Sequence, residues 1–350
     1  MDTLLTVIVP SYNGEKTLNR AMDSLLKQTI SSFEVIIVND GSKDTTAQIA
    51  DSYAARDSRV RVIHKPVNEG LSAGRNTGMA AARGQYIAFL DCDDWVESDM
   101  YETMLCNADG ADVIVVGAYH DVLNPDGSLA VSTEDAIGES VFATVKVDIA
   151  EWAAKLDEKR LFAYTWNKLY RREFLQSCSA QFAQQTLIED YQFNCEIWRH
   201  VNALKIADGC YYHYIKWSNE ALTQRYLPDY FQIMDKRYVL MRDMLCDAGI
   251  LSGKVQETLC NMHIKHIIAG MAKNCSEKAS LSGKQQRAVI RDLLNDANCR
   301  EAIQHAKGKR KQERLCNALF ALGSVTVLYG FAQLLYIMQN SKSHLFDKLK

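Results

Sequence analysis

The first hundred residues alternate between short apolar runs and longer segments with polar and apolar positions mixed at helical spacing. The apolar runs predict buried strands over residues 4–13, 33–40, 60–65 and 85–91. The segments between them predict helices over residues 16–29, 44–57 and 72–84. Repeated strand–helix units of this kind indicate an α/β fold, with a mostly parallel sheet flanked by helices.

The pattern changes along the rest of the chain. A further strand is predicted over residues 109–122, a turn over 123–129, and helices over 148–158 and 187–200. From Pro228 to residue 306 nearly every segment favours helix, with turn signals near 249–253 and 280–283. We therefore predict an α/β domain over residues 1–225, a helical region over 226–312, and a distinct segment over 313–350.

That last segment combines basic and apolar residues. The stretch KGKRKQER (307–314) holds five basic residues, and the apolar run 315–338 that follows has no charged residue. The run has the length of a membrane span, and the basic residues favour the cytoplasmic side of a membrane. Polar Asn317 and Gln333, with Gly323 and Gly330, weaken this interpretation. A helix lying in the membrane interface, or a buried or dimer-forming helix, remains an alternative.

Composition excludes several classes of protein. The chain has 350 residues, 47% hydrophobic and 24% charged, with a formal net charge of −3 and a pI near 6.3. This balance argues against a general nucleic-acid binder. The ten cysteines are scattered without a C-x-x-C pair, which is typical of reduced thiols in the cytoplasm. The N-terminus lacks the basic flank of a signal peptide, so we expect a cytoplasmic protein.

Polar residues follow three of the predicted strands, at the carboxyl ends where ligands of parallel sheets bind. One group is FLDCDDW (89–95), with Asp91, Asp93 and Asp94 crowded together. Such acids are either helix caps and solvated loop residues, or oxygen ligands for Mg²⁺ or Mn²⁺. Asp40 could accept a hydrogen bond from a base, and the Arg75 guanidinium suits phosphate recognition. A nucleotide diphosphate with its metal would explain these residues together.

The motifs VIVPSYN, EVIIVNDGSKDTT, NEGLSAGRNTGMAAARGQYIAFLDCDDW, NKLYRREFL and IEDYQF occur in that order over residues 4–200. In sequence and spacing they resemble the family 2 glycosyltransferases, which have a GT-A fold. The resemblance is greatest to bacterial members that build exopolysaccharide, capsule or teichoic-acid glycans. It implies an inverting transferase that uses a nucleotide diphosphate sugar, most simply a UDP-sugar, with Mn²⁺ or Mg²⁺.

The resemblance also implies a role for each matching residue. Asp190 would be the catalytic base, and Asp93 would bind the metal that bridges the two phosphates. The nucleotide-sugar pocket would contain Pro10, Tyr12, Asn13, Asp40, Arg75, Asp91 and Asp94. Tyr12 would lie near the nucleobase, and Asp40 would accept a hydrogen bond from uracil N3–H. Asp91 would lie near the ribose, and Asp94 on the side of the sugar. A basic residue and a serine often close over the pyrophosphate in this family, and Lys216, Ser218 and Arg225 are the candidates here.

Several of these residues have a simpler structural interpretation. Asp190 begins a predicted helix, where it would be either an ionised base or an ordinary cap. Trp166 would either stack on an acceptor sugar or belong to the core. Lys168 would form a structural salt bridge. His213 would be a third metal ligand, a phosphate contact or a satisfied core residue.

We therefore predict a metal-dependent hexosyltransferase that acts on a glycan or lipid-linked acceptor at the inner face of the cell membrane. Two alternatives remain. A sugar-nucleotidyltransferase would use a similar sheet, but its first loop needs basic residues that VPSYNGEKTL lacks. A non-catalytic nucleotide-sugar-binding partner of another transferase would be expected to lose Asp91, Asp93 or Asp190, and all are present.

Overall fold

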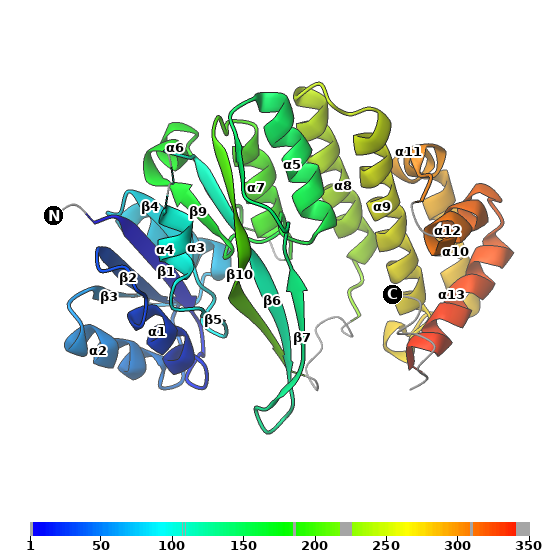
Figure 1. The fold of residues 1–350 in the computed structure, drawn as a ribbon. Helices are drawn as coiled ribbons and strands as arrows, with labels where there is room; N and C mark the ends of the chain where they lie inside the picture. Colours follow the sequence, from blue (N-terminus) through cyan, green and yellow to red (C-terminus); the bar gives the residue numbers. More distant parts are fainter. Residues whose placement is uncertain are drawn as a thin grey trace. The chain divides into compact units, whose positions relative to one another are not determined.

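The computed structural model describes residues 3–106, 108, 110–184, 187–217, 226–308 and 311–340. The chain divides into two compact units, Met1–Glu220 and Ala221–Lys350, and each is described by itself. Unit 1 is an α/β unit and unit 2 is helical (Figure 1). The predicted α/β fold with a helical C-terminal region is thus confirmed.

Unit 1 is built on one large sheet with the strand order β3-β2-β1-β4-β9-β6-β10-β5, to which β7 is added beside β6 and β8 beside β10. The strands are β1 (Leu5–Ser11), β2 (Phe33–Asn39), β3 (Val60–His64), β4 (Tyr86–Phe89), β5 (Trp95–Val96), β6 (Val113–Leu123), β7 (Leu129–Asp135), β8 (Val141–Ala143), β9 (Lys168–Arg171) and β10 (Leu204–Trp217). The flanking helices are α1 (Leu18–Leu26), α2 (Thr46–Arg56), α3 (Leu71–Ala81), α4 (Met100–Leu105), α5 (Lys146–Glu158), α6 (Arg172–Ser177) and α7 (Glu189–Trp198).

The sheet combines parallel and antiparallel pairs, and β6 and β10 pair parallel. Strands β3, β2, β1 and β4 run parallel, as predicted, and every residue of β1 and β2 is buried. Strand β9 is antiparallel to both β4 and β6, and β5, β7 and β8 also pair antiparallel. The sheet is therefore mixed, with antiparallel β9 inserted between the parallel strands β4 and β6. Short connections such as the β6–β7 turn permit antiparallel pairing, whereas parallel neighbours need a long crossover.

Unit 2 consists of helices with short connections. They are α8 (Tyr230–Asp247), α9 (Gly253–Asn274), the 3-10 turn η2 (Glu277–Ala279), α10 (Gly283–Asn295), α11 (Ala297–His305), α12 (Lys311–Ala321) and α13 (Val325–Asn340). The breaks near 249–253 and 280–283 fall where the turn signals predict them. At the start of α10, Ser282 and Gln285 form a reciprocal capping box.

The apolar run 315–338 is two helices rather than one. Helix α12 ends at Ala321 and α13 begins at Val325. Between them Gly323 has a φ of +61°, a left-handed conformation that glycine adopts without steric cost. Across the part of the chain that the structure describes, none of the helices combines the length and the apolar content needed to cross a membrane.

Candidate active site

Three strand ends form one edge of unit 1, because β2, β1 and β4 are parallel neighbours. The backbone joins them directly: Asp40 N–H donates to the Ser11 carbonyl over 2.9 Å, and Leu90 N–H donates to the Ile8 carbonyl over 3.0 Å. The prediction that the polar segments after these strands share one edge is therefore confirmed. Tyr12 is 46% exposed at this edge.

The loops after β1 and β2 hold each other in place. Asn13 has a φ of +51°, its N–H donates to Ser42 Oγ over 3.0 Å, and its Oδ1 accepts from Lys43 N–H over 2.9 Å. Pro10, which the resemblance places in the nucleotide pocket, is buried within β1. The loop that carries Tyr12 is thus fixed by polar contacts rather than by packing.

Asp40 lies beneath this edge and is only 4% exposed. It forms an ion pair with Lys65 Nζ at 2.8 Å and accepts from Gly70 N–H over 2.8 Å and Glu69 N–H over 3.1 Å. The carboxylate therefore ties the segment before α3 to the end of β2. The predicted hydrogen bond from a uracil N3–H would be one more bond to a carboxylate that already has these three partners.

Arg75 is the centre of the site. Its helix α3 lies close against β1 because Gly78 faces the strand, where a Cβ would come within 2.3 Å of Ile8 Cγ2. Arg75 is 1% exposed, and its Nη2 donates to Asp91 Oδ1 over 3.0 Å while its Nη1 donates to Asp190 Oδ1. Glu189 Oε1 lies 3.7 Å from Nη1. One guanidinium therefore joins the end of β4 to the start of α7.

Asp190 is held on both of its oxygens. It lies in the first turn of α7, as predicted. Oδ1 accepts from Arg75, and Oδ2 accepts from both the N–H and the hydroxyl of Thr165, over 3.1 and 2.9 Å. Its side chain is 13% exposed. Charge-assisted bonds of this kind fix the orientation of the carboxylate. Thr165 was not identified from the sequence.

The three acids of DCDD have three different environments. Burial raises the pKa of Asp91 to about 6, against the opposing pull of Arg75. Asp94 is 0% exposed and accepts from Tyr212 Oη over 2.7 Å and from Ile215 N–H over 2.8 Å, so both of its oxygens serve β10. Burial, with Asp93 and Asp91 nearby, holds the pKa of Asp94 well above its usual range. Asp93 alone has an exposed side chain.

The described part of the site has fewer candidate metal ligands close together than a metal ion held by the protein alone would need. Among the described residues, none of the clusters of His, Cys, Asp and Glu has three or more members arranged to hold an ion. His213, a predicted ligand, forms a hydrogen bond between Nδ1 and Asp121 Oδ2 at 2.7 Å and another between Nε2 and Glu97 Oε1 at 3.0 Å. Its ring stacks on Trp95 at 3.5 Å. Both ring nitrogens of His213 therefore already have a carboxylate partner. This arrangement agrees with the interpretation of His213 as a core histidine whose hydrogen bonds are satisfied.

The exposed Asp93 carboxylate and the nearby Asp91 are oxygen donors, which suit Mg²⁺ and Mn²⁺. These ions commonly take one or two protein carboxylates and complete their shell with substrate phosphates and water. A small protein donor set therefore fits a metal that arrives with its nucleotide.

Two other candidates prove to be internal. Trp166 is 2% exposed and stacks between Tyr164 and Tyr212, with ring centroids 4.6 and 4.1 Å away. An acceptor sugar cannot reach its ring without displacing one of them, so the core alternative describes Trp166 here. Lys168 forms no salt bridge with a carboxylate in the described residues; instead its Nζ donates to carbonyl oxygens, among them that of Leu161 over 2.7 Å. Burial lowers the pKa of Lys168 to about 7.

The segment expected to close over the pyrophosphate is only partly described. Lys216 lies at the end of β10, with Nζ 4.9 Å from the centre of the Tyr214 ring. Burial, together with Arg160, lowers the pKa of Lys216 below its usual value. Ser218 and Arg225 lie outside the described residues.

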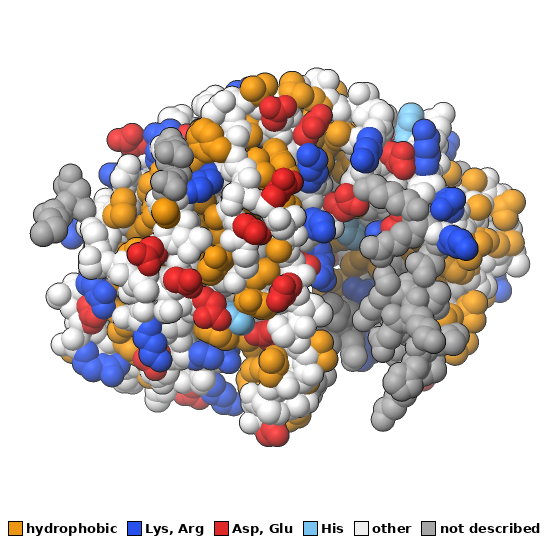
Figure 2. Space-filling model, in the orientation of Figure 1, with side chains coloured by type: hydrophobic (Ala, Val, Ile, Leu, Met, Phe, Trp, Pro, Cys, Tyr) orange, Lys and Arg blue, Asp and Glu red, His pale blue; other side chains and the backbone are white. Residues whose placement is uncertain are grey.

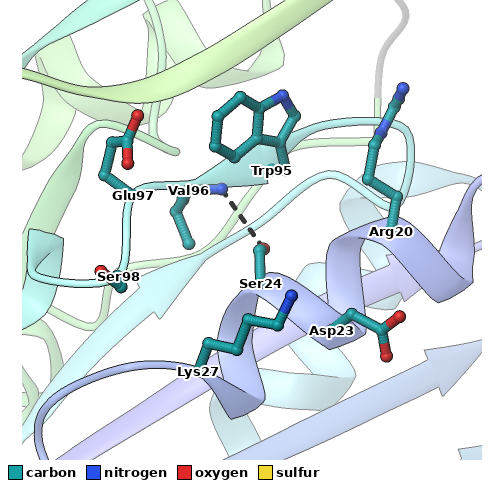
Figure 3. Close-up of a pocket in the computed structure, with 8 residues that line it drawn as sticks. All are labelled: Arg20, Asp23, Ser24, Lys27, Trp95, Val96, Glu97 and Ser98. Carbon is teal, nitrogen blue, oxygen red and sulfur yellow. Dashed lines mark hydrogen bonds between the residues drawn. The ribbon is translucent and has the colours of Figure 1, made fainter.

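A cavity of about 380 Å³ lies between α1 and β5. It is lined by Arg20, Asp23, Ser24, Lys27, Trp95, Val96, Glu97 and Ser98 (Figure 3). Ser24 Oγ accepts from Val96 N–H over 3.3 Å, and Arg20 Nη2 donates to the Asp93 carbonyl. Sequence reasoning did not identify Arg20, because its partner is a backbone oxygen far along the chain. It anchors the segment that carries Asp93.

Comparison of the sequence with known proteins identifies the family of this chain. The family model described as Glycosyl transferase family 2 matches residues 6–178. The uncharacterized glycosyltransferase EpsJ of Bacillus subtilis (strain 168) is 33% identical over 325 residues, covering 91% of this chain and 92% of EpsJ. The glycosyltransferase GlyA of Streptococcus pneumoniae serotype 4 is 36% identical over 180 residues, covering 49% of this chain but 25% of GlyA. The chain therefore belongs to glycosyl transferase family 2.

Solved structures agree on the fold. The crystal structure of residues 1–349 of TarS from S. aureus in complex with UDP superimposes with a TM-score of 0.62, covering 97% of this chain and 93% of that one at 19% identity. The complex of the same protein with UDP-GlcNAc gives a TM-score of 0.61 at 19% identity, covering 94% of this chain and 90% of that one. At this identity the likeness shows the shared GT-A fold.

Proposed function

We propose that this chain is an inverting, metal-dependent hexosyltransferase that moves a sugar from a UDP-sugar to a hydroxyl of a glycan or lipid-linked acceptor in cell-surface polysaccharide synthesis. The observation that carries the proposal is the Asp91–Arg75–Asp190 linkage at the carboxyl edge of the sheet. It joins the strand end expected to meet the nucleotide to the carboxylate expected to act on the acceptor. The UDP and UDP-GlcNAc complexes of TarS support a uridine donor.

Asp190 is the proposed general base. The acceptor hydroxyl is a poor nucleophile, and a carboxylate within hydrogen-bond reach can take its proton as it attacks the anomeric carbon. Arg75 and Thr165 hold Asp190 oriented during this step. A single in-line displacement, with one base and no carboxylate nucleophile, inverts the configuration at the anomeric carbon. The nucleoside diphosphate leaves with the electrons of the broken C–O bond.

Asp93, with Asp91 beside it, would hold the metal. When bound, the ion neutralises charge on the leaving diphosphate as a Lewis acid. The role of the chain is to bring the exposed Asp93 carboxylate to the end of β4, where Arg20 holds its backbone. Tyr12, exposed in the loop after β1, would lie against the nucleobase.

The base assignment is tested by measuring UDP release from UDP-GlcNAc and other UDP-sugars in the presence of a glycan acceptor. Asp190→Asn keeps the shape of the side chain but removes its basicity, so turnover should fall by roughly 10²–10⁴-fold while UDP affinity is retained. Glu189→Gln, at the adjacent position, is the matched control and should keep most of the activity. If the two variants exchange these results, Glu189 is the base.

The metal assignment is tested with Asp93→Ala. This variant should lose the stimulation of UDP release by Mn²⁺ and bind UDP equally with and without the ion, because the protein's exposed donor is gone. Asp126→Ala, an exposed carboxylate in the β6–β7 turn, is the control and should behave as wild type. Activity of the wild-type chain that survives EDTA would contradict metal dependence. Formation of UDP-sugar from UTP and a sugar phosphate would instead indicate a nucleotidyltransferase.

With a lipid-linked acceptor and cytoplasmic donors, the proposed reaction would take place at the inner face of the cell membrane. The basic stretch 307–314 and the apolar run after it support this placement.

A further inference from the structure

Helices α12 and α13 present large apolar side chains outward from unit 2. Leu315 is 56% exposed and Leu322 68%. On α13, Val327 is 40% exposed, Leu334 54% and Ile337 59%. We call these five residues the outer apolar face. Figure 2 shows hydrophobic side chains gathered over this end of unit 2.

The opposite side of the same helices already contacts the rest of unit 2. Phe320 is 1% exposed, Leu328 0% and Ala332 1%. Helix α13 packs on α9 and α10, and Gln333 Nε2 donates to Gln286 Oε1 over 3.0 Å. Packing within the unit therefore fixes which side of α13 points outward.

The outward side of α13 is a single stripe. At 100° per residue, Val327, Leu334 and Ile337, with Gly330 between them, fall within an arc of about 80°. Surface helices of globular proteins carry polar and charged residues on this side. Here the sequence has no charged residue between Arg314 and Lys342. The stripe therefore has the character of a face that is covered in use.

A basic group precedes the apolar face. Lys311 and Arg314 are exposed in the first turn of α12, and Lys307 is exposed in the segment before the helix. The acid of this stretch, Glu313, forms an ion pair with Lys265 of α9 at 3.0 Å, so it is turned to the unit rather than to the basic residues. The surface thus combines positive charge at one end with apolar side chains along the rest.

We propose that the outer apolar face and the basic group bind together to the surface of an anionic lipid bilayer, with α12 and α13 lying in the interface and not crossing it. Apolar side chains on one face of a helix enter the boundary between headgroups and acyl chains, and adjacent Lys and Arg residues are attracted to anionic headgroups. The break at Gly323 lets two short helices lie along the surface. The proposal deepens the membrane part of the proposed function and is independent of the transferase chemistry.

The charge favours a bilayer over a second copy of this chain as the occupant. Self-association through this face would bring two sets of Lys311 and Arg314 into one interface, where like charges repel. An anionic surface instead neutralises them. Self-association is therefore the competing outcome that the experiment must detect.

The experiment is flotation of the full chain with vesicles of phosphatidylcholine alone or with phosphatidylglycerol added. The wild-type chain should float with the anionic vesicles and remain below the neutral ones. Leu334→Ser combined with Ile337→Ser should reduce the bound fraction at least tenfold. Lys311→Gln combined with Arg314→Gln should remove the salt-sensitive part of binding.

The matched control is Leu129→Ser with Val131→Ser, a pair on β7 of similar exposure, 57% and 54%. It should bind vesicles as wild type does. All variants should keep UDP release and thermal stability, so loss of flotation is separated from loss of transferase activity or of folding. The proposal is overturned if the wild-type chain ignores anionic vesicles, or if the Leu334–Ile337 variant floats normally. It is also overturned if light scattering shows a dimer that this variant dissociates.

Discussion

Among the residues of unit 1 that the structure describes, two cations, Arg75 and Lys168, are almost fully buried, and they are held in opposite ways. Arg75 is 1% exposed and faces three carboxylates, those of Asp91, Asp190 and Glu189. Lys168 is 0% exposed and donates to carbonyl oxygens and to Asn167 Oδ1. Asp190 raises the pKa of both cations. The surroundings of the two residues therefore differ mainly in how much full negative charge they supply.

The pKa values of the two residues record this difference. Burial by itself would lower the pKa of Arg75, but Asp190, Asp91 and Glu189 hold it above its ordinary value. At Lys168 burial dominates and lowers the pKa to about 7, although Asp190 and Asp157 oppose it. Carbonyl dipoles satisfy the hydrogen bonds of a buried ammonium without balancing its charge. Arg75 therefore keeps its charge, whereas Lys168 can exchange a proton near neutral pH.

The largest effect on stability should come from Arg75→Met, which leaves Asp91, Asp190 and Glu189 without their common cation. Removing one partner of a buried ion pair costs roughly 3–5 kcal/mol of unfolding free energy, because the remaining charge is uncompensated. UDP release should also be lost, since Asp190 loses its orienting partner. Urea unfolding and the UDP-release assay measure the two effects.

Arg75→Lys is the matched variant for that experiment. It keeps the charge but not the planar fork that reaches Asp91 and Asp190 together, so it should recover stability better than activity. Equal recovery of both would show that charge alone matters at this position. A fully active Arg75→Met would contradict the central place given to this residue.

The sequence predicted the parallel half of the sheet well, for a physical reason. Strands β1 and β2 are buried on both faces, so their apolar runs are continuous and end at polar turns. The shared edge of Asp40 and Asp91 followed from that pattern. Strand β10 was not identified, because tyrosines, a histidine and a lysine along Leu204–Trp217 obscure its alternation.

The contacts inside the site were less accessible from sequence. Arg75 and Asp190 are 115 residues apart, and hydrophobic periodicity carries no information on which distant polar side chains meet. The resemblance to family 2 indicated both residues but not their contact. The core position of Trp166 was one of two open interpretations, because an aromatic residue in a mixed segment suits either a core or a sugar platform.

Lys168→Met should have a smaller effect than Arg75→Met. At alkaline pH the variant leaves Asn167 Oδ1 without its Lys168 donor, while the Leu161 carbonyl keeps only the bond from Asn167 Nδ2. We expect this loss to cost about 1–3 kcal/mol. The pKa of Lys168 is about 7 in the folded chain and 10.5 ordinarily, so the unfolded chain binds the extra proton between these values. Stability of the wild type should therefore rise with pH across this range and carry the full cost of the buried charge below about pH 7.

That cost is absent from Lys168→Met, so the difference between variant and wild type should shrink as pH falls toward neutral. Urea unfolding of both proteins across this range measures the slope. A constant difference would show that Lys168 keeps its proton throughout, and that carbonyl groups balance its charge as well as carboxylates balance that of Arg75.

Asp91→Asn should have the smallest effect on stability, because Arg75 faces more acids than it can balance. The pKa of Asp91 is raised from 3.8 to about 6, chiefly by burial, so the folded chain binds this proton more tightly than the unfolded chain does. Its ionisation therefore reduces stability as pH rises from about 4 to about 6, and the cost is fully present above that range. Asparagine removes this cost, and its Oδ1 can still accept from Arg75. At pH 4, where Asp91 is already protonated in the folded chain, we expect a change within about 1 kcal/mol, and the pH dependence between 4 and 6 should be flatter than that of the wild type. Urea unfolding at both ends of the range, with Asp126→Asn in the β6–β7 turn as control, measures it. A loss as large as that of Arg75→Met would mean that Asp91 and Arg75 form a dedicated pair, and that the cluster has no acid to spare.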